Sequence, residues 1–223
     1  MSVASSTFEA SELADLSTRF ESSPASAIVR WAVENFGDDL CLTASFQDAT
    51  LIDVATKVHP GIEVVFIDTG DHFPETLETV ERVRARYDLN LRVMRVPEPA
   101  IPFHVQDPVK CCSDAKVIAL DEALAGKRAW LSGLRRAEAD TRAEAPIVGI
   151  DRRGLVKVNP LATWSDLDVA GYMTDHDVPY NPLLDQGYPS IGCAPTTKPV
   201  EAGADPRSGR WAESDKTECG LHE

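Results

Sequence analysis

The segment Glu63-Val-Val-Phe-Ile-Asp-Thr-Gly-Asp-His-Phe-Pro74 decides the fold. Four apolar residues in a row follow Glu63, which predicts a buried strand over residues 63–67. Asp68-Thr-Gly70 then reads as a turn. A helix is expected over residues 74–87, because proline suits the first helical turn and acidic residues suit its positive end. A strand, a turn and a helix in direct succession form the repeating unit of a parallel sheet.

The same alternation continues on both sides of this segment. We expect strands over residues 40–44, 91–96 and 129–132, and helices over residues 25–36, 49–58 and 112–125. The pattern predicts an α/β protein whose mainly parallel sheet has helices on both faces. Ligands of such sheets bind at the carboxyl ends of the strands, which singles out loops 43–48 and 68–74. Loop 43–48 could equally be an ordinary capped helix start, and neither loop has a Walker or G-x-G-x-x-G pattern.

The composition limits the classes of function. With 223 residues, 43% of them hydrophobic, the chain can form one domain of ordinary size, which we expect over residues 1–200, followed by a tail over residues 201–223. No apolar stretch approaches the roughly 20 residues of a membrane span, so a cytoplasmic protein is expected. The net charge of -14 opposes nucleic-acid binding. An anionic ligand would therefore need a local cluster of cations, and two clusters are present: Arg135, Arg136 and Arg142, and Lys198, Arg207, Arg210 and Lys216.

Cysteine placement is the most specific chemical signal. An odd number of cysteines without a signal peptide indicates reduced thiols rather than a disulfide framework. Cys111 and Cys112, together with the distant Cys193, are the kind of set that holds an iron-sulfur or zinc centre. A fourth cysteine is expected three positions after Cys193, where the chain has Thr196. Cys41 lies in an apolar strand and is expected to be a core residue.

Cys219 lies near the chain end, between Glu218 and Gly220 and three residues before His222. Glycine frees the backbone and basic neighbours favour the thiolate, so this pattern is typical of a mobile nucleophile. By local sequence alone, a frayed tail without function is an equal alternative.

Taken together, the motifs resemble the assimilatory adenylyl-sulfate and phosphoadenylyl-sulfate reductases over nearly the whole chain and in order. The motifs are Leu42-Thr-Ala-Ser-Phe-Gln-Asp48, Ile67-Asp-Thr-Gly-Asp-His-Phe-Pro-Glu-Thr76, Cys111-Cys112 with Lys116, Trp130-Leu-Ser-Gly-Leu-Arg-Arg136, Val158-Asn-Pro-Leu161, Ser190-Ile-Gly-Cys193, Arg207-Ser-Gly-Arg-Trp211 and Glu218-Cys-Gly-Leu-His222. The resemblance implies an adenine nucleotide alpha-hydrolase-like fold, in which loop 43–48 is a modified phosphate loop.

The resemblance also implies a reaction: thioredoxin-dependent reduction of adenylyl sulfate to sulfite and AMP. Cys219 would attack the sulfur and carry an S-sulfocysteine, with the tail closing over a basic pocket and His222 assisting. We expect the substrate to be bound by Ser45, Thr69, Arg135, Arg207 and Arg210. The alternative substrate is the 3'-phosphorylated nucleotide, phosphoadenylyl sulfate. A homo-oligomer is also open.

In this family the cysteine pair with a distant C-x-x-C binds a 4Fe-4S cluster and marks enzymes that use adenylyl sulfate. Thr196 departs from that pattern, which leaves three readings: a cluster held by Cys111, Cys112 and Cys193 with the threonine or another fourth ligand, an apoprotein with vestigial thiols, or a sequence in which the fourth cysteine was replaced. We favour the first, because three thiols would otherwise have no visible role. Lys116 is expected near the cluster.

Two rival functions share parts of these features. ATP pyrophosphatases have the same fold but need small, flexible residues where this chain has Phe46 and Gln47, and a shared fold does not carry the function. A noncatalytic nucleotide-binding protein would leave the terminal cysteine motif unexplained.

Overall fold

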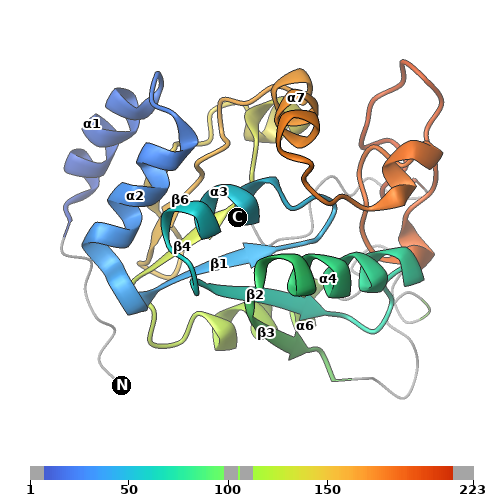
Figure 1. The fold of residues 1–223 in the computed structure, drawn as a ribbon, viewed down its shortest axis with the longest axis horizontal. Helices are drawn as coiled ribbons and strands as arrows, with labels where there is room; N and C mark the ends of the chain where they lie inside the picture. Colours follow the sequence, from blue (N-terminus) through green and yellow to red (C-terminus); the bar gives the residue numbers. More distant parts are fainter. Residues whose placement is uncertain (1–7, 98–104, 106–112, 213–223) are drawn as a thin grey trace.

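A six-stranded sheet forms the centre of the protein (Figure 1). The computed structural model describes residues 8–97, 105 and 113–212. The strand order is β3-β2-β1-β4-β6-β5. The strands are β1 (Leu40–Ala44), β2 (Glu63–Asp68), β3 (Asn90–Arg95), β4 (Ala129–Ser132), β5 (Val148–Ile150) and β6 (Val156–Val158). All neighbouring pairs are parallel except β5 with β6.

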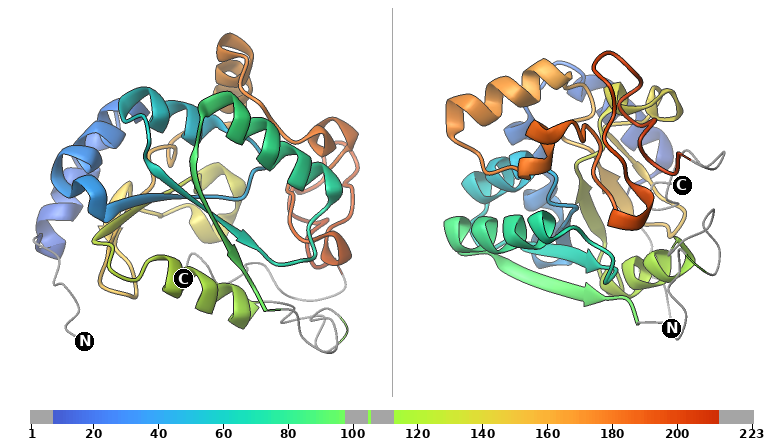
Figure 2. Two further views of the ribbon diagram at one scale, coloured as in Figure 1. Left: turned by 60° about the horizontal axis from the view of Figure 1, so that its bottom comes forward. Right: turned by 90° about the vertical axis from the view of Figure 1, so that its right-hand side faces the viewer.

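Helices cover both faces of the sheet. The α-helices described are α1 (Ala10–Phe20), α2 (Ala25–Phe36), α3 (Thr50–Val58), α4 (Pro74–Tyr87), α6 (Ser113–Ala123) and α7 (Asp166–His176). Side chains alternate along β1, so that Leu40 and Leu42 enter the core under α1 to α4, whereas Cys41 enters a second core under α6. Figure 2 shows α6 across the sheet from α3 and α4. Cys41 is fully buried, which confirms it as a core residue.

The predicted α/β architecture is confirmed, and most expected elements occur within a residue or two of their predicted bounds. The helix over 74–87 and the strand over 129–132 coincide with α4 and β4. The helix expected over 112–125 corresponds to α6, although Cys112 lies outside the described residues. Sequence reasoning missed α1, β5, β6 and α7.

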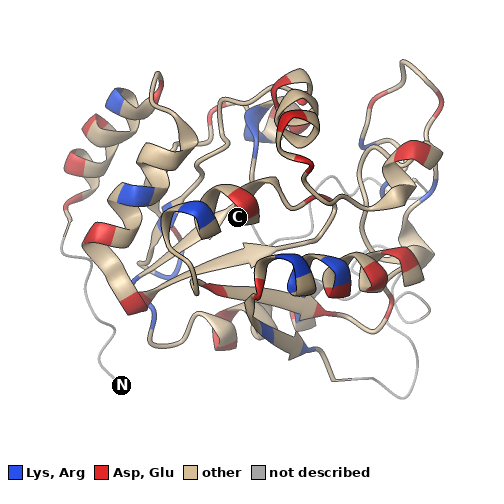
Figure 3. Cartoon of the chain, in the orientation of Figure 1, with Lys and Arg blue, Asp and Glu red and all other residues tan. Residues whose placement is uncertain are grey.

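The charges of the helices are mixed in sign rather than segregated, as Figure 3 shows along α4. Within the described part of the chain, no helix is both long enough and apolar enough to cross a membrane.

A long irregular segment, here called the C-terminal strap (residues 190–212), lies beyond the carboxyl ends of β1 and β2 (Figure 1). The backbone of this strap is attached to the loop after β2. Ala194 N donates to Asp71 O at 2.7 Å, and Cys193 and His72 form an isolated antiparallel β-bridge through their backbones. The strap therefore closes the side of the sheet where ligands of parallel α/β folds bind.

Candidate active site

A pocket of about 210 Å³ opens at the carboxyl ends of the central strands. Its walls come from loop 43–48, from α6, from the segment after β4 and from the C-terminal strap. Five cationic side chains and two carboxylates line it, so its charge is opposite in sign to the net charge of -14 of the whole chain. The charged residues are Lys116, Arg135, Arg142, Arg207, Arg210, Asp48 and Glu138. This arrangement selects an anionic ligand.

Loop 43–48 is held in shape by its larger side chains. Phe46 has a left-handed backbone (φ 57°), and its fully buried ring packs edge-on against Phe66 with centroids 5.3 Å apart. Gln47 Oε1 accepts a hydrogen bond of 2.8 Å from Ile191 N, which ties the loop to the strap. Phe46 and Gln47 therefore support the loop, while the exposed Ser45 lines the pocket.

The same loop leads directly into α3. Asp48 Oδ1 accepts from Thr50 N, the first residue of α3, at 2.9 Å, whereas the N-cap residue Ala49 makes no side-chain capping hydrogen bond. The alternative of an ordinary capped helix start is therefore not what the loop forms, and the loop lines the pocket instead.

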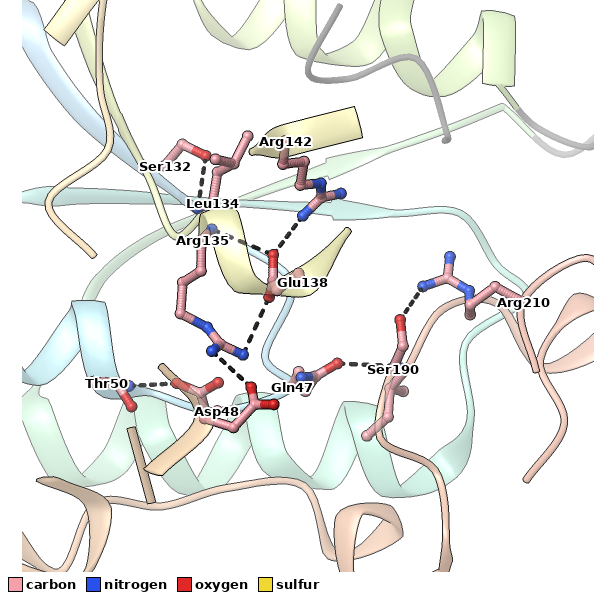
Figure 4. A network of polar contacts seen from close by, with 12 residues as sticks. Gln47, Asp48, Thr50, Ser132, Leu134, Arg135, Glu138, Arg142, Ser190 and Arg210 are labelled. Atoms are coloured by element: carbon pink, nitrogen blue, oxygen red, sulfur yellow. Dashed lines mark hydrogen bonds and ion pairs between the residues drawn. The ribbon is translucent and has the colours of Figure 1, made fainter. Parts of the chain in front are cut away.

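Two arginines after β4 are bound to carboxylates within the pocket wall (Figure 4). Glu138 bridges them, with Oε2 2.5 Å from Arg142 Nη1 and Oε1 3.6 Å from Arg135 Nη2. Asp166, at the start of α7, accepts from Arg135 Nη1 at 2.8 Å. Both guanidinium groups are nearly buried and fixed in direction, so they present charge to a ligand without needing to be ordered first.

Two further arginines of the pocket lie on the C-terminal strap. Arg210 Nη1 donates to Ser190 Oγ at 3.2 Å, and its Cζ lies 4.5 Å from the centroid of the Trp211 ring. Arg207 lies on the same ring at 5.9 Å. Two cationic side chains therefore share one buried tryptophan at the edge of the pocket.

Cys193 lies directly behind this edge and is buried. Its Sγ is 3.3 Å from Thr69 Oγ1, which follows β2 and is itself buried. Thr196, at the position where a fourth cysteine was expected, has its Oγ1 3.5 Å from Cys193 O. The threonine hydroxyl is thus directed at the backbone of its own loop.

The predicted site residues fall into three groups. Ser45, Arg135, Arg207 and Arg210 all line the pocket described above. Thr69 does not line it and contacts the Cys193 thiol instead. Cys111, Cys112, Cys219 and His222 lie outside the described residues.

Sequence reasoning missed three contributions to the pocket. Lys116, expected near a cluster, reaches the pocket from α6, and Gln47 joins the loop to the strap. Glu138 was not considered, although it follows Arg135 by three residues and precedes Arg142 by four, a spacing that indicates a shared carboxylate.

Comparison with known proteins agrees with this geometry. The phosphoadenosine phosphosulfate reductase domain model matches residues 40–199, which carry the sheet and most of the pocket. The chain is 49% identical to the adenosine 5'-phosphosulfate reductase of Streptomyces coelicolor over 91% of this chain and 89% of that one, and 46% identical to the Mycolicibacterium smegmatis enzyme of the same name over 96% and 91%.

Solved structures show the same architecture. The phosphoadenylyl-sulfate reductase of Candida auris, solved as a phosphate complex, superposes with a TM-score of 0.74 at 29% identity, over 87% of this chain and all of that one. The FMN adenylyltransferase of Candida glabrata, at 14% identity and a TM-score of 0.60 over 88% of this chain and 78% of that one, shares the fold alone. With the family model covering most of the sheet, and relatives this similar over most of their length, the chain belongs to the phosphoadenosine phosphosulfate reductase family.

Proposed function

We propose that this chain reduces adenylyl sulfate to sulfite and AMP during sulfate assimilation. The observation that carries the proposal is the cationic pocket at the strand ends of a strongly acidic protein, where five lysine and arginine side chains meet two carboxylates. The names of the Streptomyces coelicolor and Mycolicibacterium smegmatis relatives support the same reaction.

The nucleophile in this proposal is the Cys219 thiolate. Its sulfur attacks the sulfur of the sulfo group, a new S–S bond forms, and the S–O bond to the AMP phosphate breaks with its electron pair leaving on AMP. An S-sulfocysteine remains on the enzyme. A free thiol with a pKa near 8.5 is only a few per cent ionised at neutral pH, so the cationic pocket also serves to favour the thiolate.

A dithiol protein such as thioredoxin completes the cycle. One thiolate of thioredoxin attacks Cys219 Sγ and releases sulfite, and its second thiol resolves the mixed disulfide. The dithiol is oxidised by two electrons and the sulfo group is reduced by two. We place the reaction in the cytoplasm, where such dithiols are kept reduced.

The names of the bacterial relatives favour adenylyl sulfate over its 3'-phosphorylated form. The Streptomyces coelicolor and Mycolicibacterium smegmatis relatives are both named adenosine 5'-phosphosulfate reductases. Phosphoadenylyl sulfate, the substrate named for the Candida auris relative, is the alternative. Sulfite release measured with each nucleotide in turn decides between the two substrates.

We also propose that Cys111, Cys112 and Cys193 hold a 4Fe-4S cluster. The Thr69 hydroxyl beside Cys193 can donate to a thiolate, which suits a ligand sulfur. Thr196 does not offer a fourth thiolate, and its hydroxyl is directed at a backbone carbonyl. Held by these three thiolates, such a cluster would have one iron without a cysteine ligand from this set, which would be open to an exchangeable ligand.

Replacing Cys219 with serine tests the central claim. Sulfite release should be abolished while nucleotide affinity stays close to that of the wild type. Wild-type protein incubated with adenylyl sulfate and no reductant should gain one sulfo group, which peptide mass spectrometry should locate at Cys219. Sulfite production within about tenfold of the wild type, or a sulfo group on Cys193, contradicts the mechanism.

A further inference from the structure

The Arg210 guanidinium lies in a narrow slot. It lies over the Trp211 ring, with Cζ 4.5 Å from the ring centroid. The backbone of Gly192 also lies against the group, because a Cβ atom at Gly192 would overlap Nη2 and Cζ and would lie 2.8 Å from Nε. Ser190 Oγ accepts from Nη1 at 3.2 Å. The guanidinium is thus packed against a ring and a glycine backbone and is hydrogen-bonded at one nitrogen.

Backbone pairing within the C-terminal strap builds this slot. Trp211 N donates to Thr196 O at 2.9 Å, and Lys198 N donates to Gly209 O at 2.8 Å. A bridge between Thr197 and Arg210 completes the pairing. Trp211 adopts a left-handed backbone (φ 50°), which turns its ring under the preceding arginine.

Gly192 is needed for space rather than for conformation. Its φ lies outside the positive region that favours glycine, so alanine can adopt its backbone angles. What alanine cannot do is share the volume of the Arg210 guanidinium. Because that group is the far end of a flexible side chain, it can move aside without disturbing the backbone.

We infer that Gly192 and Trp211 are positioning residues that hold the Arg210 guanidinium flat at the pocket edge, ready to bind the sulfo group of the substrate. The inference rests on the proposed function for the identity of the ligand. A guanidinium fixed in advance loses less rotamer entropy when the anion binds, and its planar edge directs its donors at the ligand. Binding of the sulfo group therefore depends on the space that Gly192 leaves open as well as on Arg210 itself.

The test is a double-mutant cycle between Gly192→Ala and Arg210→Ala. All proteins carry Cys219→Ser, so that adenylyl sulfate binds without turnover, and the dissociation constants of adenylyl sulfate and AMP are measured by titration calorimetry. Gly192→Ala should raise the dissociation constant of adenylyl sulfate at least about tenfold, as loss of a charge-assisted hydrogen bond does. The dissociation constant of AMP should rise by a smaller factor. Once Arg210 is alanine, adding Gly192→Ala should change either constant by less than about twofold. Gly171→Ala, on α7 with nothing within 4 Å of an added Cβ, is the matched control.

Each outcome decides the matter. The inference is overturned if Gly192→Ala leaves the dissociation constant of adenylyl sulfate unchanged. It is also overturned if Gly192→Ala raises that constant by the same factor when Arg210 is already alanine. If Gly192→Ala instead lowers the thermal midpoint, adding Arg210→Ala should restore it, and failure to do so also overturns the inference. A parent protein that binds AMP but not adenylyl sulfate would refute the proposed function rather than the slot.

Discussion

Asp53 provides a test of what holds the pocket loop's helix in place. Its side chain on α3 is 4% exposed and lies 2.6 Å from Lys57 Nζ. It accepts hydrogen bonds from the hydroxyls of Tyr172 on α7, at 2.6 Å, and Tyr87 on α4, at 3.1 Å. One buried carboxylate therefore joins three helices. We expect Asp53→Asn, which keeps the shape and removes the charge, to lower the free energy of unfolding.

The magnitude follows from the three contacts. Replacing a charged acceptor by a neutral one costs about 1 kcal/mol for each tyrosine hydrogen bond. The Lys57 side chain is 51% exposed, so solvent screening limits its ion pair to about 1 kcal/mol or less. The total is about 2 to 3 kcal/mol, or a thermal midpoint lowered by about 4 to 12 °C for a chain of this length.

The loss should depend on pH with a definite sign. Burial raises the pKa of Asp53, but hydrogen bonds from Lys57, Tyr172 and Tyr87 together outweigh it and leave the pKa below its usual value. The native protein thus binds this proton less readily than the unfolded chain. The stabilisation is present above the unfolded pKa of about 3.9 and is lost as the pH falls through the lower native pKa. The urea-unfolding curves of wild type and Asp53→Asn should converge in acid.

The matched control is Asp177→Asn, because Asp177 pairs with Arg86 at 2.9 Å but is 93% exposed. Its left-handed backbone (φ 50°) is one that asparagine tolerates. The free energy of unfolding should change far less for this variant than for Asp53→Asn, because solvent screens an exposed ion pair. The reasoning is refuted if Asp53→Asn lowers the free energy of unfolding no more than Asp177→Asn does, or if its effect does not vary with pH.

Three other outcomes are expected. Thr196→Cys should raise iron retention and slow bleaching in air, since thiolate is the stronger ligand for iron; if both proteins stay free of iron after anaerobic reconstitution, the cluster is ruled out. Burial raises the pKa of the Cys41 thiol to about 12, so Cys41 should resist alkylation until the protein unfolds, and peptide mapping that finds the label on Cys41 of the native protein would contradict its place in the core. Arg207→Ala should weaken adenylyl sulfate binding, by a factor that shrinks with added salt if the contact is electrostatic, as titrations at two salt concentrations will show.

The sequence predicts those parts of the fold that rest on local signals. Pro74 is the first residue of α4, and β4 is fully buried with three apolar residues before Ser132, so both have the predicted bounds. Strands β5 and β6 have three residues each, too few for a periodic pattern. Helix α7 buries only Val169, so its sequence shows no apolar face.

The site residues also divide into those that local sequence signals predict and those that they do not. Ser45 and Arg135 follow β1 and β4, and the rule for strand ends places them in one pocket. The contact between Thr69 and Cys193 joins residues 124 positions apart, and the slot around Arg210 depends on how the strap pairs with itself. Neither follows from spacing, because each requires the chain to be closed first.

The attachment of the C-terminal strap also fixes a length. Backbone pairing holds Trp211 at the pocket edge, and only the residues from Ala212 onward separate that anchor from Cys219. At about 3.6 Å per residue over the steps from Trp211 to Cys219, Cys219 can be no more than about 29 Å from its anchor. A single thiol confined to a sphere of that radius has a local concentration on the order of 10 mM or more. In the proposed mechanism, sulfo transfer to Cys219 is thereby an intramolecular event whose rate, once the nucleotide is bound, does not depend on how dilute the protein is.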